Sequence, residues 1–217
     1  MTKPEVMKRI LGLGIVPVVR APSGDEALRM VDAIREGGVD VVELTMTVPG
    51  APDVIDALVR RFGADVVVGA GTVLDRDAAR RCIQAGAQFV VSPIVDPPTI
   101  DLCRGEDVPV MPGALTPTEV VRAWSGGADV VKVFPCGAVG GASYIRALKA
   151  PFPEIPLMPT GGVSLDTAAD FIRAGASAVG AGADLVDLAL LRQGKGAEIA
   201  EKARRYVEVI RAARERR

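Results

Sequence analysis

Residues 128–134 read ADVVKVF, a short apolar run that a single lysine, Lys132, interrupts. Seven further runs of similar length, rich in Val and Ile, occur along the chain: residues 15–20, 39–45, 65–71, 88–93, 108–113, 155–160 and 177–182. Most of them lack the alternation of apolar and polar residues that a half-exposed strand shows. Such runs are typical of strands buried on both faces, as in a parallel sheet.

The segments between the runs carry helical periodicity and helix start signals. Ser23 through Glu26 fits a capping box, and the stretch Thr116-Pro-Thr-Glu119 fits a second one with proline in the first turn. Asp75 can cap a third helix. The sequence therefore alternates predicted strands with predicted helices.

Eight strand–helix units within 217 residues predict the α/β class and a single (β/α)₈ barrel, the TIM barrel. An open doubly wound sheet is the alternative, but such sheets usually have about five or six strands. We expect one domain over residues 1–217. It would comprise a leader helix over 1–13 that closes the bottom of the barrel, the barrel itself over 14–195, and a C-terminal helix with a frayed basic tail over 196–217.

Composition excludes several classes of function. Lys and Arg total 26 against 27 for Asp and Glu, so the near-zero net charge gives no reason to expect nucleic acid or a membrane surface as partner. The chain has no histidine, which excludes Ser–His and Cys–His catalysis and most zinc sites. We expect no metal or cofactor. With three cysteines, no signal-peptide core and no long apolar run, a cytoplasmic location is expected.

Lys132 is the first candidate catalytic residue, because the reactive groups of a barrel lie where strands end. A lysine inside a buried strand loses hydration, which disfavours its charged form. A neutral, positioned amine can attack a ketone and form a Schiff base. The alternative is a structural lysine that pairs with a buried carboxylate or extends to the strand end.

Glu43 interrupts the run 39–45 in the same way. A buried carboxylate needs a cation or hydrogen-bond donors, and across the barrel mouth it could lie near Lys132. There it could move protons during imine formation and at the carbon next to the carbonyl. Glu43 could equally be the counter-ion of Lys132 or Arg20, and both interpretations stay open.

Further candidates bind anions. Arg20 ends the first run and could bind a carboxylate or phosphate, or form a surface salt bridge. Gly161-Gly162 and the segment Gly180 to Gly182 end the last two runs, where backbone N–H groups favour phosphate. Gly69-Ala-Gly71 is not a dinucleotide-binding motif, because no third glycine follows at the right spacing. Cys136 has no histidine to activate it, which favours a packing role.

Taken in order, the motifs resemble the class I 2-keto-3-deoxy-6-phosphogluconate (KDPG) and 4-hydroxy-2-oxoglutarate (KHG) aldolases. The resemblance covers about residues 10–190 and rests on these stretches: Pro17-Val-Val-Arg20, Glu43-Leu-Thr45, Gly69-Ala-Gly-Thr-Val73, Phe89-Val-Val-Ser-Pro93, Met111-Pro-Gly113, Thr116-Pro-Thr-Glu119, Lys132-Val-Phe-Pro135 and Pro159-Thr-Gly-Gly-Val163. It implies a homotrimeric TIM barrel that reversibly cleaves a 2-keto-3-deoxy acid into pyruvate and an aldehyde such as glyceraldehyde 3-phosphate.

The resemblance also assigns residues. The Schiff-base lysine falls on Lys132, the proton-shuttling glutamate on Glu43, and the threonine that contacts the pyruvate carboxylate on Thr72. Other positions line the site by the same matching: Arg20, Pro93, Phe134 and Thr160. The phosphate end comprises Gly161, Gly162, Gly182 and position 183.

Two departures from the family pattern bear on substrate binding. Thr47 stands where several members have an arginine that grips the carboxylate, so binding must depend on Arg20, Thr72 and backbone donors. Ala183 stands where many members have a serine for the phosphate, which weakens the expectation of a phosphorylated substrate. Two other functions remain open: a sugar-phosphate isomerase or epimerase with Glu43 as base, and a non-catalytic, trimeric ligand-binding scaffold.

Overall fold

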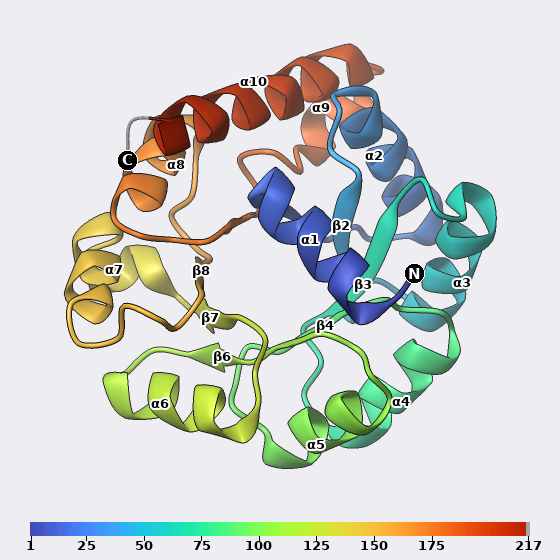
Figure 1. Cartoon of the computed structure of the whole chain (residues 1–217). Coiled ribbons are helices and arrows are strands. Elements are labelled where there is room, and N and C mark those ends of the chain that lie inside the picture. The colour runs from blue at the N-terminus through green and yellow to red at the C-terminus, as the bar shows by residue number, and fades with distance from the viewer. Residues whose placement is uncertain (216–217) are drawn as a thin grey trace.

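The computed structural model describes residues 1–215, in which strands and helices alternate (Figure 1). The strands are β1 (Ile15–Val19), β2 (Val41–Thr45), β3 (Val67–Gly71), β4 (Val90–Val91), β5 (Val110–Met111), β6 (Gly113–Ala114), β7 (Val131–Val133), β8 (Leu157–Pro159) and β9 (Val179–Ala181). The helices are α1 (Lys3–Leu13), α2 (Gly24–Glu36), α3 (Ala51–Phe62), α4 (Arg76–Gln84), α5 (Pro97–Gly105), α6 (Pro117–Gly126), η1 (Cys136–Val139), α7 (Ala142–Lys149), α8 (Leu165–Arg173), α9 (Leu188–Arg192) and α10 (Gly196–Glu215).

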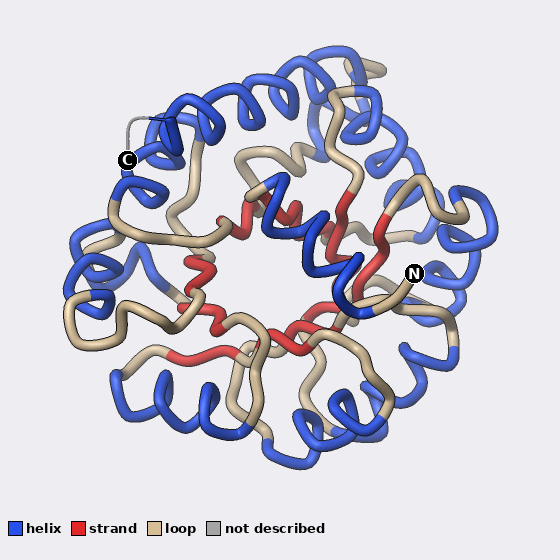
Figure 2. The backbone as a smooth tube through the Cα atoms, viewed as in Figure 1, coloured by secondary structure: helices blue, strands red, loops and turns tan. Residues whose placement is uncertain are grey.

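The strands form a curled parallel sheet, and the helices other than α1 lie outside it (Figure 2). Six strands follow the order β5-β4-β3-β2-β1-β9, and three more follow the order β6-β7-β8. Every strand overlaps one of the eight apolar runs, which confirms the α/β class and the parallel sheet. The run 108–113 differs from expectation, because Pro112 has no N–H to donate and separates β5 from β6.

Side chains of the strands alternate between two apolar layers. Those that point into the curl form a cluster with Val6 and Ile10 of α1, in which Val41, Phe89 and Met158 are fully buried. Figure 1 shows α1 lying across this end of the sheet, as expected of the leader helix. Side chains that point outward pack under the surrounding helices. The helix α1 covers the end of the sheet where the strands begin. The opposite end, where the strands finish, is therefore the expected place of an active site.

The predicted caps of α4 and α6 are confirmed, whereas the capping box predicted for α2 is only half formed, because the Glu26 carboxylate pairs with Arg192 instead. The Ser23 hydroxyl accepts from the N–H of Glu26 at 3.3 Å, and Asp75 accepts from the N–H of Ala78 at 2.7 Å. Thr116 and Glu119 form a reciprocal capping box at the start of α6. The helices α3, α5 and α7 begin without one of these predicted signals. The helix α5 begins with two prolines after Asp96, which caps it by accepting from the N–H of Thr99.

The expectation of a frayed basic tail is wrong for the residues that the structure describes. The helix α10 continues to Glu215, and Ala213 is buried on its inner face. The Arg214 guanidinium donates to the carbonyls of Leu11, Gly12 and Ser177, which joins the last turn of α10 to the end of α1. Carbonyls in the last turn of a helix have no partner within that helix. Here those at the end of α1 accept from the charged end of α10, a contact that the composition of the segment does not predict. Residues 216 and 217 lie outside the described part.

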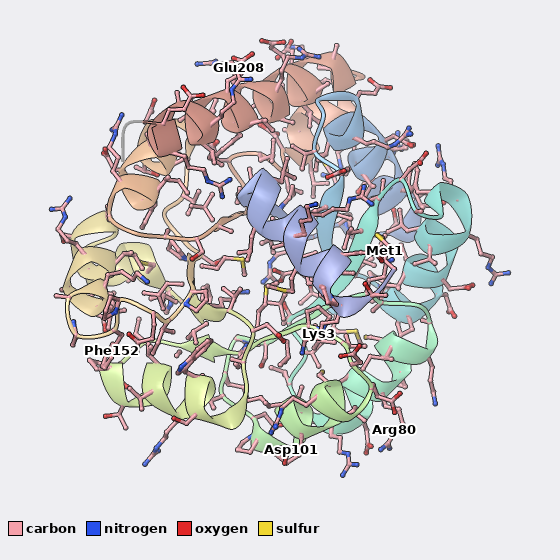
Figure 3. All side chains as sticks on the ribbon, in the orientation of Figure 1. Met1, Lys3, Arg80, Asp101, Phe152 and Glu208 are labelled. Carbon is pink, nitrogen blue, oxygen red and sulfur yellow. The ribbon has the colours of Figure 1, made fainter. Side chains whose placement is uncertain are left out.

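Charged side chains cover the outer ring of helices. Figure 3 shows Arg80, Asp101 and Glu208 on that rim, whereas Lys3 lies on α1, where its amine pairs with Asp129 at 2.9 Å. Over residues 1–215, every helix is too short or too polar to cross a membrane.

Candidate active site

A cavity of about 320 Å³ opens at the carboxyl ends of the strands, opposite α1. Strands β1, β7, β8 and β9 and the loops after them supply its walls. The lining residues are Val18, Arg20, Lys132, Phe134, Thr160, Gly161, Gly162, Val163, Gly182, Ala183 and Asp184. The structure thus brings together eight of the residues that the sequence analysis selected from separate strand ends.

Lys132 and Glu43 form a buried ion pair beneath this cavity. The Lys132 Nζ lies 3.6 Å from the Glu43 Oε1, and the two residues are 3% and 0% exposed. The amine also lies 5.4 Å from the centroid of the Phe134 ring. A separation of 3.6 Å exceeds a hydrogen bond, so the carboxylate attracts the amine without holding its proton. The pair can therefore exchange protons with a third group that enters between them.

Arg20 stands at the mouth of the cavity, where threonine hydroxyls orient it. Its guanidinium donates to the Thr47 Oγ1 at 3.4 Å and to the Thr72 Oγ1 at 3.3 Å. The Thr47 hydroxyl lies 2.7 Å from that of Thr45, which donates to the carbonyl of Val19. Thr47 and Thr72 thus reach the cavity through Arg20 and do not line it. At position 47, where the resemblance implies an arginine in several family members, this chain has a hydroxyl that accepts from Arg20, the residue after β1.

Thr72 has a φ of +57°, in the left-handed region that a β-branched residue rarely adopts. We expect Thr72→Gly to raise the free energy of unfolding by about 1 kcal/mol, because the relieved strain exceeds the entropic cost of glycine. The resemblance implies that Thr72 contacts the carboxylate of pyruvate, so we expect the loss of the hydroxyl to weaken binding of pyruvate as Arg20 loses a partner. Urea unfolding and calorimetric titration with pyruvate measure the two effects. Thr72→Ser, which keeps the hydroxyl, should bind pyruvate as the parent does; a less stable Thr72→Gly would contradict the prediction.

The far end of the cavity is made of glycine turns. Gly161 and Gly162 have φ values of +87° and +78°, which only glycine adopts without strain. The Gly182 carbonyl accepts from the N–H groups of Leu185 and Val186, so a helical turn starts at this end of the cavity. Backbone N–H groups in such turns can bind an anion.

The turn after β9 is held by α10, which the sequence analysis did not connect with the site. The Tyr206 hydroxyl donates to the Asp184 carboxylate at 2.6 Å, and the Lys202 amine donates to the Asp184 carbonyl at 2.7 Å. Burial, together with the hydrogen bond to Asp184, raises the pKa of the Tyr206 hydroxyl. Spacing offers no signal for this contact, because Asp184 and Tyr206 lie on different elements.

Pro93 lies apart from the other candidates. It lines a neighbouring cavity of about 660 Å³ beside α5 and α6, together with Ile94, Leu115 and Arg122. Phe134 lines both cavities, and its ring centroid lies 5.4 Å from the Lys132 Nζ.

Cys136 is buried against the loop after β7, and burial raises the pKa of its thiol to about 11. The same cause raises the pKa values of Cys82 and Cys103 to about 11 and about 12. We expect iodoacetamide at neutral pH to label none of the three thiols in the folded protein and all of them in urea, because the thiolate is the reactive form. Mass spectrometry reads the labels, and rapid labelling of folded Cys136 would argue against its packing role.

Known proteins resemble this chain in sequence and in fold. A family model described as KDPG and KHG aldolase matches residues 6–202. The chain belongs to this aldolase family. The 2-dehydro-3-deoxy-phosphogluconate aldolase of Haemophilus influenzae is 30% identical and covers 97% of this chain and 99% of its own. The 2-dehydro-3-deoxy-6-phosphogalactonate aldolase of Escherichia coli K12 is 34% identical over 93% of this chain and 96% of its own.

A solved relative bears on the chemistry of the aldolase. The KDPG aldolase of Legionella pneumophila, whose structure captured pyruvate as a covalent carbinolamine intermediate, is 25% identical. It superposes with a TM-score of 0.84 and covers 92% of this chain and 96% of its own. A carbinolamine is the step before a Schiff base, so the Legionella enzyme reacts with pyruvate as a class I aldolase does. This chain, as a member of the same family, is an aldolase, a lyase that cleaves carbon–carbon bonds.

Proposed function

We propose that Lys132 is the Schiff-base lysine of this aldolase and that the substrate is a 2-keto-3-deoxy acid, cleaved reversibly into pyruvate and an aldehyde. One observation carries the proposal: the single amine in the cavity wall is 3% exposed and lies 3.6 Å from a fully buried carboxylate. The neighbouring carboxylate can take a proton from the amine, which leaves a neutral nucleophile for the carbonyl.

The reaction then proceeds in balanced steps. The neutral Lys132 Nζ attacks the C2 carbonyl, and a C–N bond forms. Glu43 gives the proton that it took from Lys132 to the C2 hydroxyl, which leaves as water, so that a protonated imine forms and Glu43 is again a carboxylate. Glu43 takes the proton of the C4 hydroxyl, the C3–C4 bond breaks, and its electron pair moves to the imine nitrogen. The aldehyde leaves, and the enamine takes a proton at C3 from Glu43. Water then hydrolyses the imine, releasing pyruvate and the free amine.

We infer where the two ends of the substrate bind from the charge and the shape of the cavity. Arg20, with Thr47 and Thr72 behind it, would bind the carboxylate of the keto acid. Thr160 and Phe134 would flank the reacting carbons, and Pro93 would contribute through Phe134. Gly161, Gly162, Gly182 and Ala183 would bind a terminal phosphate through backbone N–H groups, which leaves room for a phosphorylated substrate without the serine.

We further propose that the strands close into an eight-stranded barrel within a single domain. A parallel bridge between Thr160 and Gly180 joins β8 to β9, and Pro112 alone separates β5 from β6 in the chain. One apolar cluster extends from β1 to α10, which supports a single domain. Exposed Ile94, Val121 and Trp124 support assembly into a homotrimer, and three unpaired cysteines support a cytoplasmic location.

A pyruvate-release assay tests the function. Three substrates are compared: KDPG, its galactonate epimer and KHG. We expect release from at least one, unchanged by a metal chelator, because the imine performs the polarisation that a Lewis acid would otherwise supply. Failure to release pyruvate from any of them would reject the aldol cleavage and favour the isomerase or the scaffold.

A further inference from the structure

The carboxylate of Glu43 is not held by hydrogen bonds. Within residues 1–215, three buried side-chain oxygens lack a hydrogen-bond partner, and they are the two oxygens of Glu43 and the Oγ1 of Thr160. Within the same residues, the polar contact of the Glu43 carboxylate is the ion pair with Lys132, at a distance too long for a hydrogen bond. The lone pairs of both oxygens are therefore free to accept a proton from a substrate group. The packing around the Glu43 side chain must therefore determine where the carboxylate lies.

The neighbouring strand makes room for the carboxylate, because it has a glycine where a side chain would stand. Strand β3 pairs with β2 in a register that sets Gly69 opposite Glu43 and Gly71 opposite Thr45. A Cβ atom at position 71 would overlap the Oε1, Cγ and Cδ of Glu43. The carboxylate thus occupies the space that any other residue at position 71 would fill. The φ of Gly71 is not in the left-handed region, so backbone conformation does not explain this glycine.

The other glycine of the motif, Gly69, makes room for a different side chain. A Cβ atom at Gly69 would overlap the ring of Phe89, which belongs to the inner apolar cluster beneath the site. Gly69 therefore packs the core, and Gly71 faces the reactive pair. The spacing of Gly69-Ala-Gly71 is not that of a dinucleotide-binding motif, and packing explains why each of the two positions is a glycine.

We propose that Gly71 is a positioning residue for proton transfer: the absence of a side chain there sets the Glu43 carboxylate beside Lys132 without a hydrogen bond. This inference rests on the proposed function and adds to it the residue that places the base. Gly71→Ala displaces the carboxylate from its site, and a displacement of about 1 Å costs a reaction about 10²-fold. Imine formation with pyruvate survives, because Lys132 is intact.

The test measures solvent deuterium entering the methyl group of pyruvate, which requires the imine, the enamine and a base but no aldehyde. NMR follows exchange in the parent, Gly71→Ala, Glu43→Ala and the double variant. Alanine at position 43 lacks the Oε1, Cγ and Cδ atoms that a Cβ at position 71 would overlap, so it leaves room for that Cβ. We expect Gly71→Ala to slow exchange about 10²-fold in the parent and to change the slower exchange of the Glu43→Ala background by less than about tenfold. The amount of borohydride-trapped pyruvate at saturation should stay at the parent level.

Gly69→Ala is the matched control, because it lies on the same strand and the atoms nearest to its Cβ belong to Phe89. Its effect on exchange should be the same in both backgrounds, and thermal unfolding verifies that each variant folds. Parent-like exchange in Gly71→Ala, or an equal loss in both backgrounds, would overturn the role of Gly71. Absence of both exchange and trapping in the parent would instead reject the proposed function.

Discussion

Lys132→Ala abolishes cleavage while the protein stays folded. Removal of the nucleophile removes the covalent route, so we expect activity to fall on the order of 10⁵-fold or more, to the limit of detection. Alanine also leaves the fully buried Glu43 without a cation, which should lower the free energy of unfolding by about 3 kcal/mol. A coupled pyruvate assay and urea unfolding measure the two losses.

Two further variants separate chemistry from charge pairing. Lys132→Arg keeps a cation beside Glu43 but cannot supply a neutral amine, so it should be as inactive as Lys132→Ala. Replacing the pair together, as Lys132→Met with Glu43→Gln, should recover most of the lost stability, because no charge then remains buried. Substantial cleavage by Lys132→Arg would contradict the Schiff-base role.

Glu43→Gln slows turnover by about 10²- to 10⁴-fold, the range that general acid–base groups contribute. Glutamine has the shape of glutamate but cannot take the C4 hydroxyl proton or return it to the enamine. Pyruvate should still be trapped on Lys132, because the amine remains. Steady-state kinetics on the preferred substrate and deuterium exchange into pyruvate give the two rates.

The same variant decides between the two interpretations of Glu43. If Glu43 only balances the charge of Lys132, Glu43→Gln should change the extent of trapping and leave the exchange rate per trapped enzyme unchanged. A shuttle predicts the reverse, with trapping retained and exchange lost. An exchange rate within about twofold of the parent would contradict the proton-transfer role, because the expected loss is far larger.

The sequence predicted the strand pattern and the reactive pair for the same physical reason. Charged residues are costly in buried strands, so Lys132 and Glu43 are conspicuous in their runs, and the structure places them 3.6 Å apart. Arg20, Thr160 and the glycine turns followed from their positions at strand ends, and they line one cavity. Local patterns were sufficient here because the topology gathers strand ends.

Contacts between distant segments could not be predicted in this way. Arg214 was expected in a solvated tail, but its partners are carbonyls at the end of α1, which no local pattern reveals. The hydrogen bond from Tyr206 to Asp184 depends on how α10 packs. The role of Thr47 as a support for Arg20, and the overlap that Gly71 avoids, depend on atomic positions on neighbouring strands.

Borohydride reduction in the presence of pyruvate tests the central claim most directly. The claim is that one buried amine forms a covalent imine with the keto acid. Intact-mass analysis should show one reduced pyruvate per chain, and peptide mapping should place it on Lys132, with no adduct in Lys132→Arg. An unmodified Lys132, under conditions in which another class I aldolase is fully labelled, would contradict the account.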